Sequence, residues 1–554
     1  MAFVSAMNAP SLTKSGVNGS DVYTADGVGD PRVALYTSLV RDCDAEFIRT
    51  QMKAIRGMSA EQSDGSFPLR DAFVMAYQTR DVRGGKGERD AAYRMLVELA
   101  EGQSAENVES MVRLVVEYGC WRDVFALMEM SSVSGNFPFT VAVQKVIQEQ
   151  LVADEAAMAA GKSVSLLAKW MPREGKKGER RVDMFAGVKS DDSDRTANWK
   201  RMTYRKRIVA LNKHMKTAEI AMCGGKWATI KPGAVPGRCL KKCKAAFFNE
   251  ALAPHRVKGQ AAQTTGQERS ASEDRRACAQ HFKEHIKGGK AVKGATTVFP
   301  HEIVKDIQRA SADQQALLEA QWAAIREAAA GKGGFRRTVP LADFSGSMEG
   351  VPMLVSMALG ILMSEVNHEA FRDHVLTFSE KPTWVNLQGS KNLAEKVRRC
   401  KESPWGMSTN IEAAFDLILQ RMMEHKVPVG EEPEDLVIFT DMGWDAALCA
   451  KSVIWQTHID ILQEKFRAAS ERTWGAGQPG WKIPRIIVWN LRAAFKDYHA
   501  TAQATGVIQL SGWSPSTLKV LQEGAISTPT PYQSLRAVLD DSRYDRVRAE
   551  IAIA

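Results

Sequence analysis

The chain has 554 residues, of which 44% are hydrophobic and 25% charged, and a formal net charge of +9 at pH 7. This length exceeds one ordinary hydrophobic core and predicts two or three domains, and the composition excludes a disordered or fibrous protein. No apolar run reaches the roughly 18 residues of a membrane span. The polar N-terminus lacks the basic start and apolar core of a secretory signal, so we expect a cytoplasmic protein without membrane contact.

The positive charge is concentrated in one segment. Residues 162–258 hold 24 Lys and Arg against 8 Asp and Glu, whereas the residues from Arg336 onward hold 24 against 26. Such a concentration indicates a polyanionic partner, although a solvated surface that only keeps the protein soluble explains the charge equally well. The eight cysteines are sparse and scattered, which favours reduced thiols over a disulfide framework.

The first part of the chain reads as helical. Residues 1–30 are small and polar and are expected to form a flexible tail, and apolar residues then recur at helical spacing up to residue 335. The expected helices cover 34–58, 67–77, 90–101, 107–118, 121–130, 141–160, 204–223, 240–251 and 312–330. A polar insertion interrupts them near 258–276. This run of helices predicts a helical-repeat domain over 31–335, although no clean repeat is visible.

After residue 335 the pattern changes to alternating strands and helices. The expected strands cover 338–342, 374–378, 436–440, 485–489 and 506–510. This alternation is typical of an α/β fold with a doubly wound parallel sheet. We therefore expect a second domain over 336–530, followed by a C-terminal helix and tail over 531–554.

Oxygen-bearing side chains follow the first of these strands. Asp343, Ser345 and Ser347 alternate on a turn that leads into a helical pattern. Hard oxygen ligands that face one point suit Mg²⁺ or Mn²⁺. The order of strand, turn and helix places that point at the carboxyl edge of a parallel sheet, where open α/β folds bind ligands.

The DxSxS pattern resembles the metal-ion-dependent adhesion site (MIDAS) of von Willebrand factor A domains. In that family a distant Thr and a distant Asp complete the magnesium site, which implies the same role for Thr409 and Asp441. Thr409 precedes a helical run, and Asp441 follows an apolar strand. Such a metal has no obvious general base beside it, and its open coordination position suits a carboxylate from an acidic partner.

The segment from Arg80 to Asp90 is rich in glycine and charge. Its glycines permit close backbone approach, and its charges can meet phosphate. It is not a Walker A loop, because no Ser or Thr follows Lys86 and no strand precedes the segment. The alternative is an ion-paired turn between two helices, with Asp90 as the N-cap of the second.

Tryptophan and basic residues are interleaved around Trp170, Trp199 and Trp227. Aromatic rings can stack nucleic-acid bases while the cations hold phosphates. The alternative is that each Trp packs in a helical core.

Residues His281 to His285 follow the HxxEH pattern of some zinc peptidases. Together with His281, the nearby Cys239, Cys243 and Cys278 can instead form a structural zinc site. The sequence shows no nucleophile elbow, no dinucleotide-binding fingerprint and no Ser-His-Asp set, so we expect no catalytic residues and a protein that is not an enzyme.

From about residue 35 to 525 the chain resembles the TROVE-type proteins, which include the Ro autoantigen, and more closely an uncharacterised TROVE-like family. The family usually has Gly-Thr-Asp at the third metal loop, where this chain has Ser408-Thr409-Asn410. The matching segments are YQTRDVRGGKGER at 77–89, EYGCWRD at 117–123, AKWMPRE at 168–174, GKW at 225–227, FPHEIV at 299–304, the Asp343 turn, WGMSTN at 405–410, FTDM at 439–442, VWNLR at 488–492 and residues 506–515.

The resemblance implies a HEAT-like helical-repeat ring closed by a von Willebrand A domain. It also implies a monomeric, non-catalytic RNA-binding protein that acts in a ribonucleoprotein, as a small-RNA scaffold or a quality-control chaperone. The RNA contacts of Ro proteins do not map one to one onto this chain. From charge and family motif, the expected RNA-contacting residues are Arg83, Lys86, Arg89, Lys169, Arg173, Arg201, Arg205, Lys206, Arg207, Lys213, Lys216, Lys241 and Lys242.

Two other functions fit the same sequence. In the first, the protein is an interaction or structural module whose metal recruits an acidic partner, as in a viral or assembly component. In the second, it is an Mg²⁺-dependent nuclease.

Overall fold

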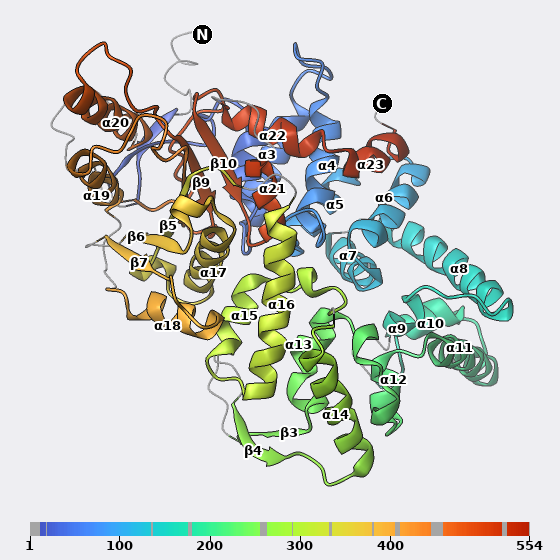
Figure 1. Ribbon diagram of the computed structural model, residues 1–554. Helices are drawn as coiled ribbons and strands as arrows, with labels where there is room; N and C mark the ends of the chain where they lie inside the picture. Colours follow the sequence, from blue (N-terminus) through green and yellow to red (C-terminus); the bar gives the residue numbers. More distant parts are fainter. Residues whose placement is uncertain are drawn as a thin grey trace. The chain divides into compact units, whose positions relative to one another are not determined.

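The structure is a computed structural model that describes residues 11–17, 19–134, 137–175, 180–254, 263–290, 292–331, 335–378, 382–404, 410–444, 458–522 and 529–552 (Figure 1). The chain divides into two compact units. The first, called the sheet unit, comprises Met1–Ala92, Ala251–Gln267 and Gly294–Tyr544. The second, called the helical unit, comprises Tyr93–Glu250, Glu268–Lys293 and Asp545–Ala554.

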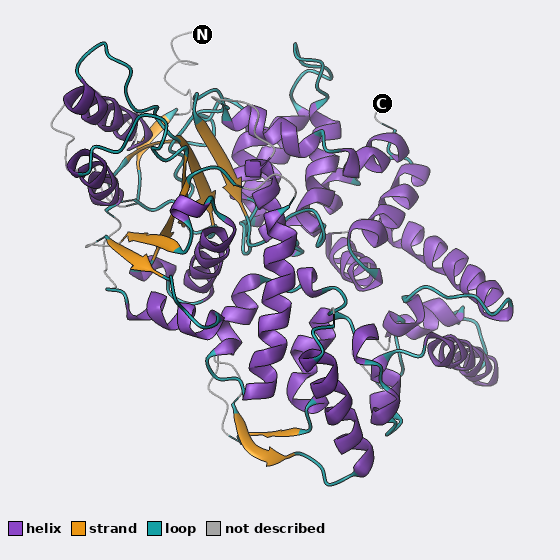
Figure 2. Cartoon of the chain, viewed as in Figure 1, coloured by secondary structure: helices purple, strands orange, loops and turns teal. Residues whose placement is uncertain are grey.

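A six-stranded, mostly parallel sheet organises the sheet unit (Figure 2). The strand order is β10-β9-β8-β5-β6-β7, and only β7 runs antiparallel to its neighbour. The strands are β5 (Thr338–Asp343), β6 (His374–Phe378), β7 (Thr383–Asn386), β8 (Asp435–Thr440), β9 (Arg485–Asn490) and β10 (Val507–Ser511). The predicted α/β architecture is therefore confirmed, and β7 is the one strand of this sheet that the sequence did not indicate.

Helices cover both faces of the sheet. The side chain of Leu341 on β5 belongs to a core with α19 (Ile411–Glu424) and α20 (His458–Trp474). The next residue, Ala342, faces the opposite side, where Gly360 of α17 (Val351–Val366) packs close to it. Successive side chains alternate between the two faces of a strand, and β5, β8, β9 and β10 are buried along their whole length because both faces are covered.

Further helices of the sheet unit precede and follow these elements. α15 and α16 pack on α17, and α18 contacts β7. Their bounds are α15 (Pro300–Ile307), α16 (Ala312–Ala330), α18 (Leu393–Glu402) and α21 (Lys519–Gln522).

Helices from both ends of the chain pack against the edge strand β10. They are α2 (Pro31–Ser38) and α22 (Pro531–Leu539), and α4 (Pro68–Arg80) contacts both of them. Asp71 on α4 holds this group together, because its carboxylate accepts hydrogen bonds from Arg32 at 2.8 Å and Arg536 at 2.6 Å. The compact units therefore depart from the predicted boundary at residue 335, since the helices before Tyr93 belong with the sheet.

The N-terminal segment forms more structure than the predicted flexible tail. β1 (Thr13–Ser15) and β2 (Asp21–Tyr23) pair as an antiparallel hairpin. The backbone of Tyr23 also pairs with Tyr498, and the buried carboxylate of Asp497 binds Lys14 at 2.5 Å. These contacts fix the segment to the sheet unit, and residues 1–10 lie outside the described part of the chain.

The expected helix over 34–58 is two helices, α2 and α3 (Ala45–Arg56). Asp42 between them has a φ of 65°, which a helix does not tolerate, and Asp44 caps the second helix by accepting from the amide of Glu46. Part of the predicted polar insertion is ordered as β4 (Thr264–Glu268), which pairs with β3 (Glu250–Leu252), whereas residues 255–262 are outside the described residues.

The helical unit consists mainly of helices packed in chain order. α6, α7 and α8 contact one another, and α11 contacts α8, α9 and α10. The helices in and leading into this unit are α5 (Asp90–Leu99), α6 (Ala105–Tyr118), α7 (Trp121–Ser134), α8 (Phe137–Ala159), α9 (Leu167–Trp170), α10 (Arg180–Ala186), α11 (Asp194–Met215), α12 (Ala218–Cys223), α13 (Gly237–Phe247), α14 (Glu273–Lys287) and α23 (Asp545–Glu550). Among the described residues, no helix has both the length and the apolar character needed to cross a membrane.

Candidate metal centre and nucleic-acid interface

The carboxyl ends of β5 and β8 bring two oxygen-rich loops together. These strands are parallel neighbours, so Asp343 and Asp441 follow at the same edge of the sheet. Asp343 is fully buried, and its Oδ1 accepts a hydrogen bond from the amide of Ser345 at 2.8 Å. Its Oδ2 accepts one from Thr440 Oγ1, across the two strands, at 3.1 Å.

The two serines of the DxSxS turn face each other. Ser345 Oγ lies 3.0 Å from Ser347 Oγ. A 3₁₀ turn over Gly346–Met348 carries them between β5 and α17. The exposed guanidinium of Arg492, which follows β9, donates to the backbone oxygen of Ser347. The contact between the two serines and the hydrogen bond from Arg492 therefore both stabilise the turn, and the Arg492 cation lies beside it.

Only one carboxylate oxygen of Asp441 has a hydrogen-bond partner among the described residues. Its Oδ1 accepts from the amide of Gly443 at 3.1 Å, whereas Oδ2 is buried and has no hydrogen-bond partner among the described residues. The next residue, Met442, has a φ of 76°, which is unusual for a residue with a side chain. Backbone strain of this kind gathers at functional sites.

The two carboxylates repel each other. Burial and, second, the charge of Asp441 raise the pKa of Asp343 to about 7, and hydrogen bonds from Ser345 and Thr440 limit the rise. Burial also raises the pKa of Asp441. The Ser347 hydroxyl, the Gly443 amide and the charge of Arg492 each lower it, but by less. A cation bound between the two groups would offset both costs.

The donor set fits Mg²⁺ or Mn²⁺. It consists of two carboxylates and two hydroxyls, all hard oxygen ligands, on Asp343, Asp441, Ser345 and Ser347. Among the described residues, no three His, Cys, Asp or Glu side chains form a group that could hold a metal ion. A centre with only two carboxylates does not form such a group, so this finding does not bear on it.

Thr409, the fifth predicted ligand, lies within residues 405–409, outside the described part of the chain. The next residue, Asn410, caps α19 by accepting from the amide of Ala413 at 2.9 Å. The zinc alternative gains no support, because the described residues Cys239, Cys243, Cys278 and His281 do not come together as a metal-binding group.

Lys86 is not an RNA contact in this structure, which corrects the sequence prediction. Its side chain is fully buried, and its Nζ donates to the backbone oxygen of Tyr36 and to Ser511 Oγ, each at 2.6 Å. The ammonium also lies 3.7 Å from the centre of the Tyr36 ring. Burial holds the pKa of Lys86 well below its usual value.

The glycines around Lys86 explain why the segment folds inward. A Cβ at Gly85 would overlap the carbonyl oxygen of Gln78, and Gly87 has a φ of 70°. Gly512, in the left-handed region at φ 106°, lies directly against the Lys86 side chain. The glycines therefore serve close packing inside the sheet unit rather than access for phosphate.

Four of the predicted cations on and near α11 are engaged in ion pairs. Arg201 pairs with Asp183 at 2.6 Å and Arg207 with Glu155 at 2.5 Å. The other two pairs are Arg205 with Glu174 at 3.4 Å and Lys169 with Glu219 at 2.5 Å. Arg201, Arg207 and Lys169 are only half-exposed, so part of their charge faces these carboxylates and not solvent.

One side of α11 presents apolar and basic residues together to solvent. Trp199 is 59% exposed, and Met202 and Val209 are exposed as well. Lys206 and Lys213 are exposed and have no ion pair among the described residues. These five positions are spaced by three or four residues, which puts them on one side of a helix; we call them the α11 face. Lys216, which caps α11, is also exposed.

The other two predicted tryptophans differ from each other. Trp170 is 36% exposed, with Arg122 at 5.4 Å and Lys169 at 5.8 Å from its ring centre. Trp227 is half-buried in the helical unit, with Arg275 over its ring at 3.6 Å and Phe247 in an edge-to-face contact. Part of this ring is therefore packed against other side chains, as the core-packing alternative expects.

The remaining predicted cations are spread over the surface. Arg83 is exposed and Arg89 half-buried in the sheet unit. In the helical unit, Arg173 and Lys242 are exposed, whereas Lys241 is half-buried.

Two further residues, Thr440 and Arg492, contact the candidate metal centre without having been indicated by the sequence pattern. Thr440 reads as the last residue of a strand, yet its hydroxyl binds Asp343 Oδ2. Its position directly before Asp441 was the available signal. Arg492 lies more than a hundred residues after the DxSxS turn, and only the neighbouring ends of β5, β8 and β9 bring it there.

Comparison with known proteins gives two similarities. Residues 337–548 match a family described as a domain of unknown function (DUF7788). The chain is also 28% identical over 473 residues to "Uncharacterized protein L728" of Acanthamoeba polyphaga mimivirus. The aligned residues cover 83% of this chain and 77% of the viral protein.

Proposed function

We propose that this protein is a non-catalytic RNA-binding protein, a scaffold or quality-control chaperone for small RNA, whose sheet unit is a von Willebrand A-like domain that binds Mg²⁺ or Mn²⁺. The observation that carries the RNA proposal is the α11 face. There an indole that is 59% exposed lies on the same side of the helix as Lys206 and Lys213, which lack acidic partners among the described residues.

Physical chemistry favours RNA over simple solubility for this face. A large aromatic ring left in water forgoes the stabilisation that burial would give it. Solubility requires only charge, so it does not account for Trp199, Met202 and Val209. Single-stranded RNA uses both components, because bases stack on aromatic rings and phosphates pair with cations. The resemblance to TROVE-type proteins supports the same reading.

The same proposal includes the finer architecture. The helical unit would be a HEAT-like repeat, part of a ring in the Ro manner, in a monomeric cytoplasmic ribonucleoprotein. Asp343, Ser345, Ser347, Thr409 and Asp441 would hold the metal, which supplies a Lewis-acidic site for an oxygen ligand from a partner.

A second function is favoured by Arg492. This exposed guanidinium contacts the DxSxS turn, and Arg is the side chain best shaped to pair with a carboxylate. A metal and an arginine side by side suit an acidic protein partner. In this reading the protein is an interaction or structural module, such as a viral assembly component.

The test is binding of a labelled single-stranded RNA and a labelled small structured RNA, titrated against salt. The variant carries Lys206→Glu, Lys213→Glu and Lys216→Glu. Each lost phosphate contact lowers the salt slope by roughly 0.7 to 0.9, so we expect a slope smaller by about 2 and weaker binding of both RNAs.

The matched control reverses three exposed lysines of the sheet unit, Lys391, Lys426 and Lys482. It changes the net charge by the same amount, so it should keep most of the affinity. Equal losses in both variants would mean that only net charge attracts RNA. No salt-dependent binding by the wild type would overturn the proposal and favour the acidic-partner function.

A further inference from the structure

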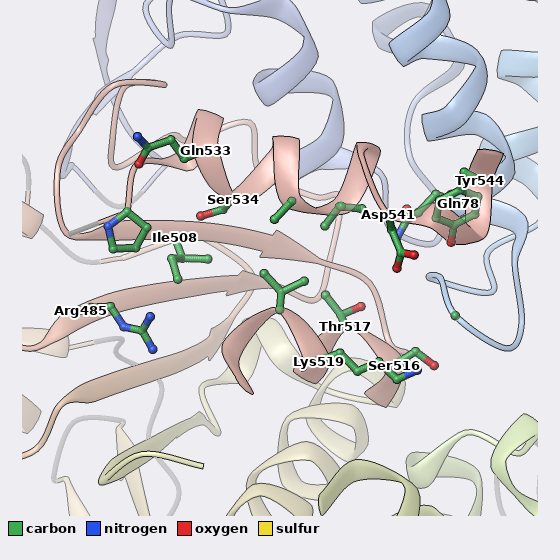
Figure 3. A pocket seen from close by; sticks show the side chains of 15 residues that line it. Gln78, Arg485, Ile508, Ser516, Thr517, Lys519, Gln533, Ser534, Asp541 and Tyr544 are labelled. Atoms are coloured by element: carbon green, nitrogen blue, oxygen red, sulfur yellow. The ribbon is translucent and has the colours of Figure 1, made fainter. Parts of the chain in front are cut away.

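A cavity of about 170 Å³ lies in the sheet unit between α22 and the strands β9 and β10 (Figure 3). Gln78 and Asp541 lie at one end of it and Arg485 at the other. The guanidinium of Arg485 already binds the carboxylate of Asp435 at 2.6 and 2.7 Å. The polar groups of this lining therefore do not converge on one point, and the cavity does not define a ligand. A pair of thiols in the helical unit does define a chemistry.

Cys239 and Cys243 are four residues apart on α13, which puts both thiols on one side of the helix. The two side chains hydrogen-bond each other, and both residues are half-buried free cysteines. Cys239 Sγ also lies 3.9 Å from Glu219 Oε1, and the Glu219 carboxylate pairs with Lys169 at 2.5 Å. Two thiols in contact at a partly exposed position can react with each other as well as with solutes.

The surroundings make the two thiols unequal. The pKa of Cys243 is lowered to about 7, and the largest cause is the hydrogen bond that it accepts from Cys239. The charges of the exposed Lys242 and Arg269 act in the same direction, while burial and the charge of Glu219 act in the opposite one. The same hydrogen bond, burial and Glu219 raise the pKa of Cys239. At neutral pH Cys243 is therefore partly a thiolate, the reactive form, and Cys239 keeps its proton.

The position of the pair in α13 permits a disulfide. Residues four apart in an α-helix have Cα atoms about 6 Å apart, within the roughly 4.4 to 6.8 Å of disulfides. Their Cβ atoms, about 5 to 6 Å apart in a helix, have to approach by about 1 to 2 Å. Cys239 stands in the first turn of α13, where the amide has no carbonyl partner four residues earlier in the helix. This turn can therefore shift with the loss of few helical hydrogen bonds.

We propose that Cys239 and Cys243 form a redox-active dithiol, which hydrogen peroxide oxidises to a reversible disulfide. The Cys243 thiolate attacks one peroxide oxygen and the O–O bond breaks, which gives a sulfenic acid on Cys243 and a hydroxide that takes a proton from solvent. The Cys239 thiol then attacks the Cys243 sulfur, the S–O bond breaks, and the leaving hydroxide combines with the Cys239 proton as water. The two sulfurs lose two electrons and the peroxide gains them. The site does not depend on RNA binding by the α11 face or on metal at Asp343.

The experiment treats the reduced full chain with hydrogen peroxide, alkylates the remaining thiols and maps tryptic peptides without reduction by mass spectrometry. Trypsin cleaves between the two cysteines, after Lys241 or Lys242, so the expected disulfide joins two separate peptides. We expect this linked pair to be the main product at low peroxide and to disappear with dithiothreitol, by thiol–disulfide exchange. If Cys239 and Cys243 stay reduced while other cysteines oxidise, or if the main disulfide joins another pair, the proposal is wrong.

Two variants separate the steps. Cys239→Ser removes the thiol that resolves the sulfenic acid, so dimedone, which labels sulfenic acids, should label Cys243 in this variant and leave it unlabelled in the wild type. Cys243→Ser should lose the linked peptides and gain no label at Cys239, because that thiol keeps its proton. Absence of dimedone label on Cys243 in Cys239→Ser would contradict the first step.

The matched control is Cys223→Ser, which removes an exposed thiol of α12 in the same unit. It should form the disulfide between Cys239 and Cys243 in the same yield as the wild type. Loss of that disulfide in the control would show that Cys223 takes part in the reaction and would overturn the proposal. Thermal unfolding of each variant checks that the fold is retained.

Discussion

Lys86 Nζ lies 2.6 Å from Ser511 Oγ, in the interior of the sheet unit. This contact joins the glycine-rich segment before α5 to the last residue of β10, across 425 positions of sequence. Ser511 Oγ also lies 2.5 Å from the carbonyl oxygen of Tyr36. The lysine thus ties the N-terminal helices to the edge of the sheet, a structural role for a residue whose motif suggested phosphate binding.

Replacing Lys86 by Met should therefore destabilise the protein without changing its affinity for RNA. The substitution leaves the carbonyl oxygens of Tyr36 and Leu39 without this donor, and a buried acceptor that loses its donor costs about 1 to 3 kcal/mol in the free energy of unfolding. Urea denaturation measures the loss, and the salt titration of RNA binding checks the affinity. Normal stability with weakened RNA binding would return Lys86 to the RNA interface.

Metal binding should stabilise the sheet unit through the pair of buried carboxylates. We expect Mg²⁺ or Mn²⁺ at 100 times its dissociation constant to raise the free energy of unfolding by about 2.7 kcal/mol. Asp343→Asn should abolish this rise, yet should stabilise the metal-free protein, because it removes the repulsion between Asp343 and Asp441. Thermal unfolding with metal or with a chelator measures both effects.

The control for this prediction is Asp416→Asn, which removes an exposed carboxylate of α19 that pairs with Lys465. It should keep the full response to metal. If Asp343→Asn responds to metal like the wild type, the DxSxS turn is not the metal site.

Hydrophobic patterning was sufficient to predict most of the sheet. β5, β8, β9 and β10 are continuous buried runs, and a run of this kind differs clearly from its polar surroundings in the sequence. β7 has four residues, of which only Val385 is buried. So short an edge strand leaves almost no pattern, and its pairing with β6 becomes visible only in the fold.

The residues of the candidate metal centre that stand at or just after a strand end could be predicted from the sequence. Asp343, Ser345, Ser347 and Asp441 could be read from the sequence, and the structure places them together. Lys86 could not be read correctly, because burial depends on partners that are 50 and 425 positions away. A lysine among glycines looks the same in sequence whether it faces phosphate or a carbonyl oxygen.

Glu88 should make stability depend on pH in a defined direction. It is 3% exposed and pairs with Arg41, but burial outweighs this pair and raises the pKa of Glu88. The folded state therefore holds the proton more tightly than the unfolded state, and stability falls as pH rises from the ordinary Glu pKa of about 4.3 through the raised value.

The measurement for Glu88 is the difference in unfolding free energy between the wild type and Glu88→Gln from pH 4 to 7. The wild type should lose stability relative to the variant as pH rises in this window. A relative gain would mean that the ion pair with Arg41 outweighs burial. Arg41→Gln separates the effect of burial from that of the ion pair. Without Arg41 the effect of burial on Glu88 is less opposed, so the loss of stability with rising pH should be steeper.

Trp199 gives the most direct test of the RNA interface. Its ring is 59% exposed on the α11 face, so Trp199→Ala should cost little stability. If a base stacks on the ring, the substitution should weaken binding of single-stranded RNA by about 1 to 3 kcal/mol, with a nearly unchanged salt slope, because no charge is lost. Trp199→Phe should recover part of the affinity, since an aromatic face remains.

Trp227→Ala is the contrasting change, because Trp227 packs against Arg275 and Phe247 and its loss should lower stability first. Unchanged RNA binding in Trp199→Ala would leave the α11 face an electrostatic surface without base stacking.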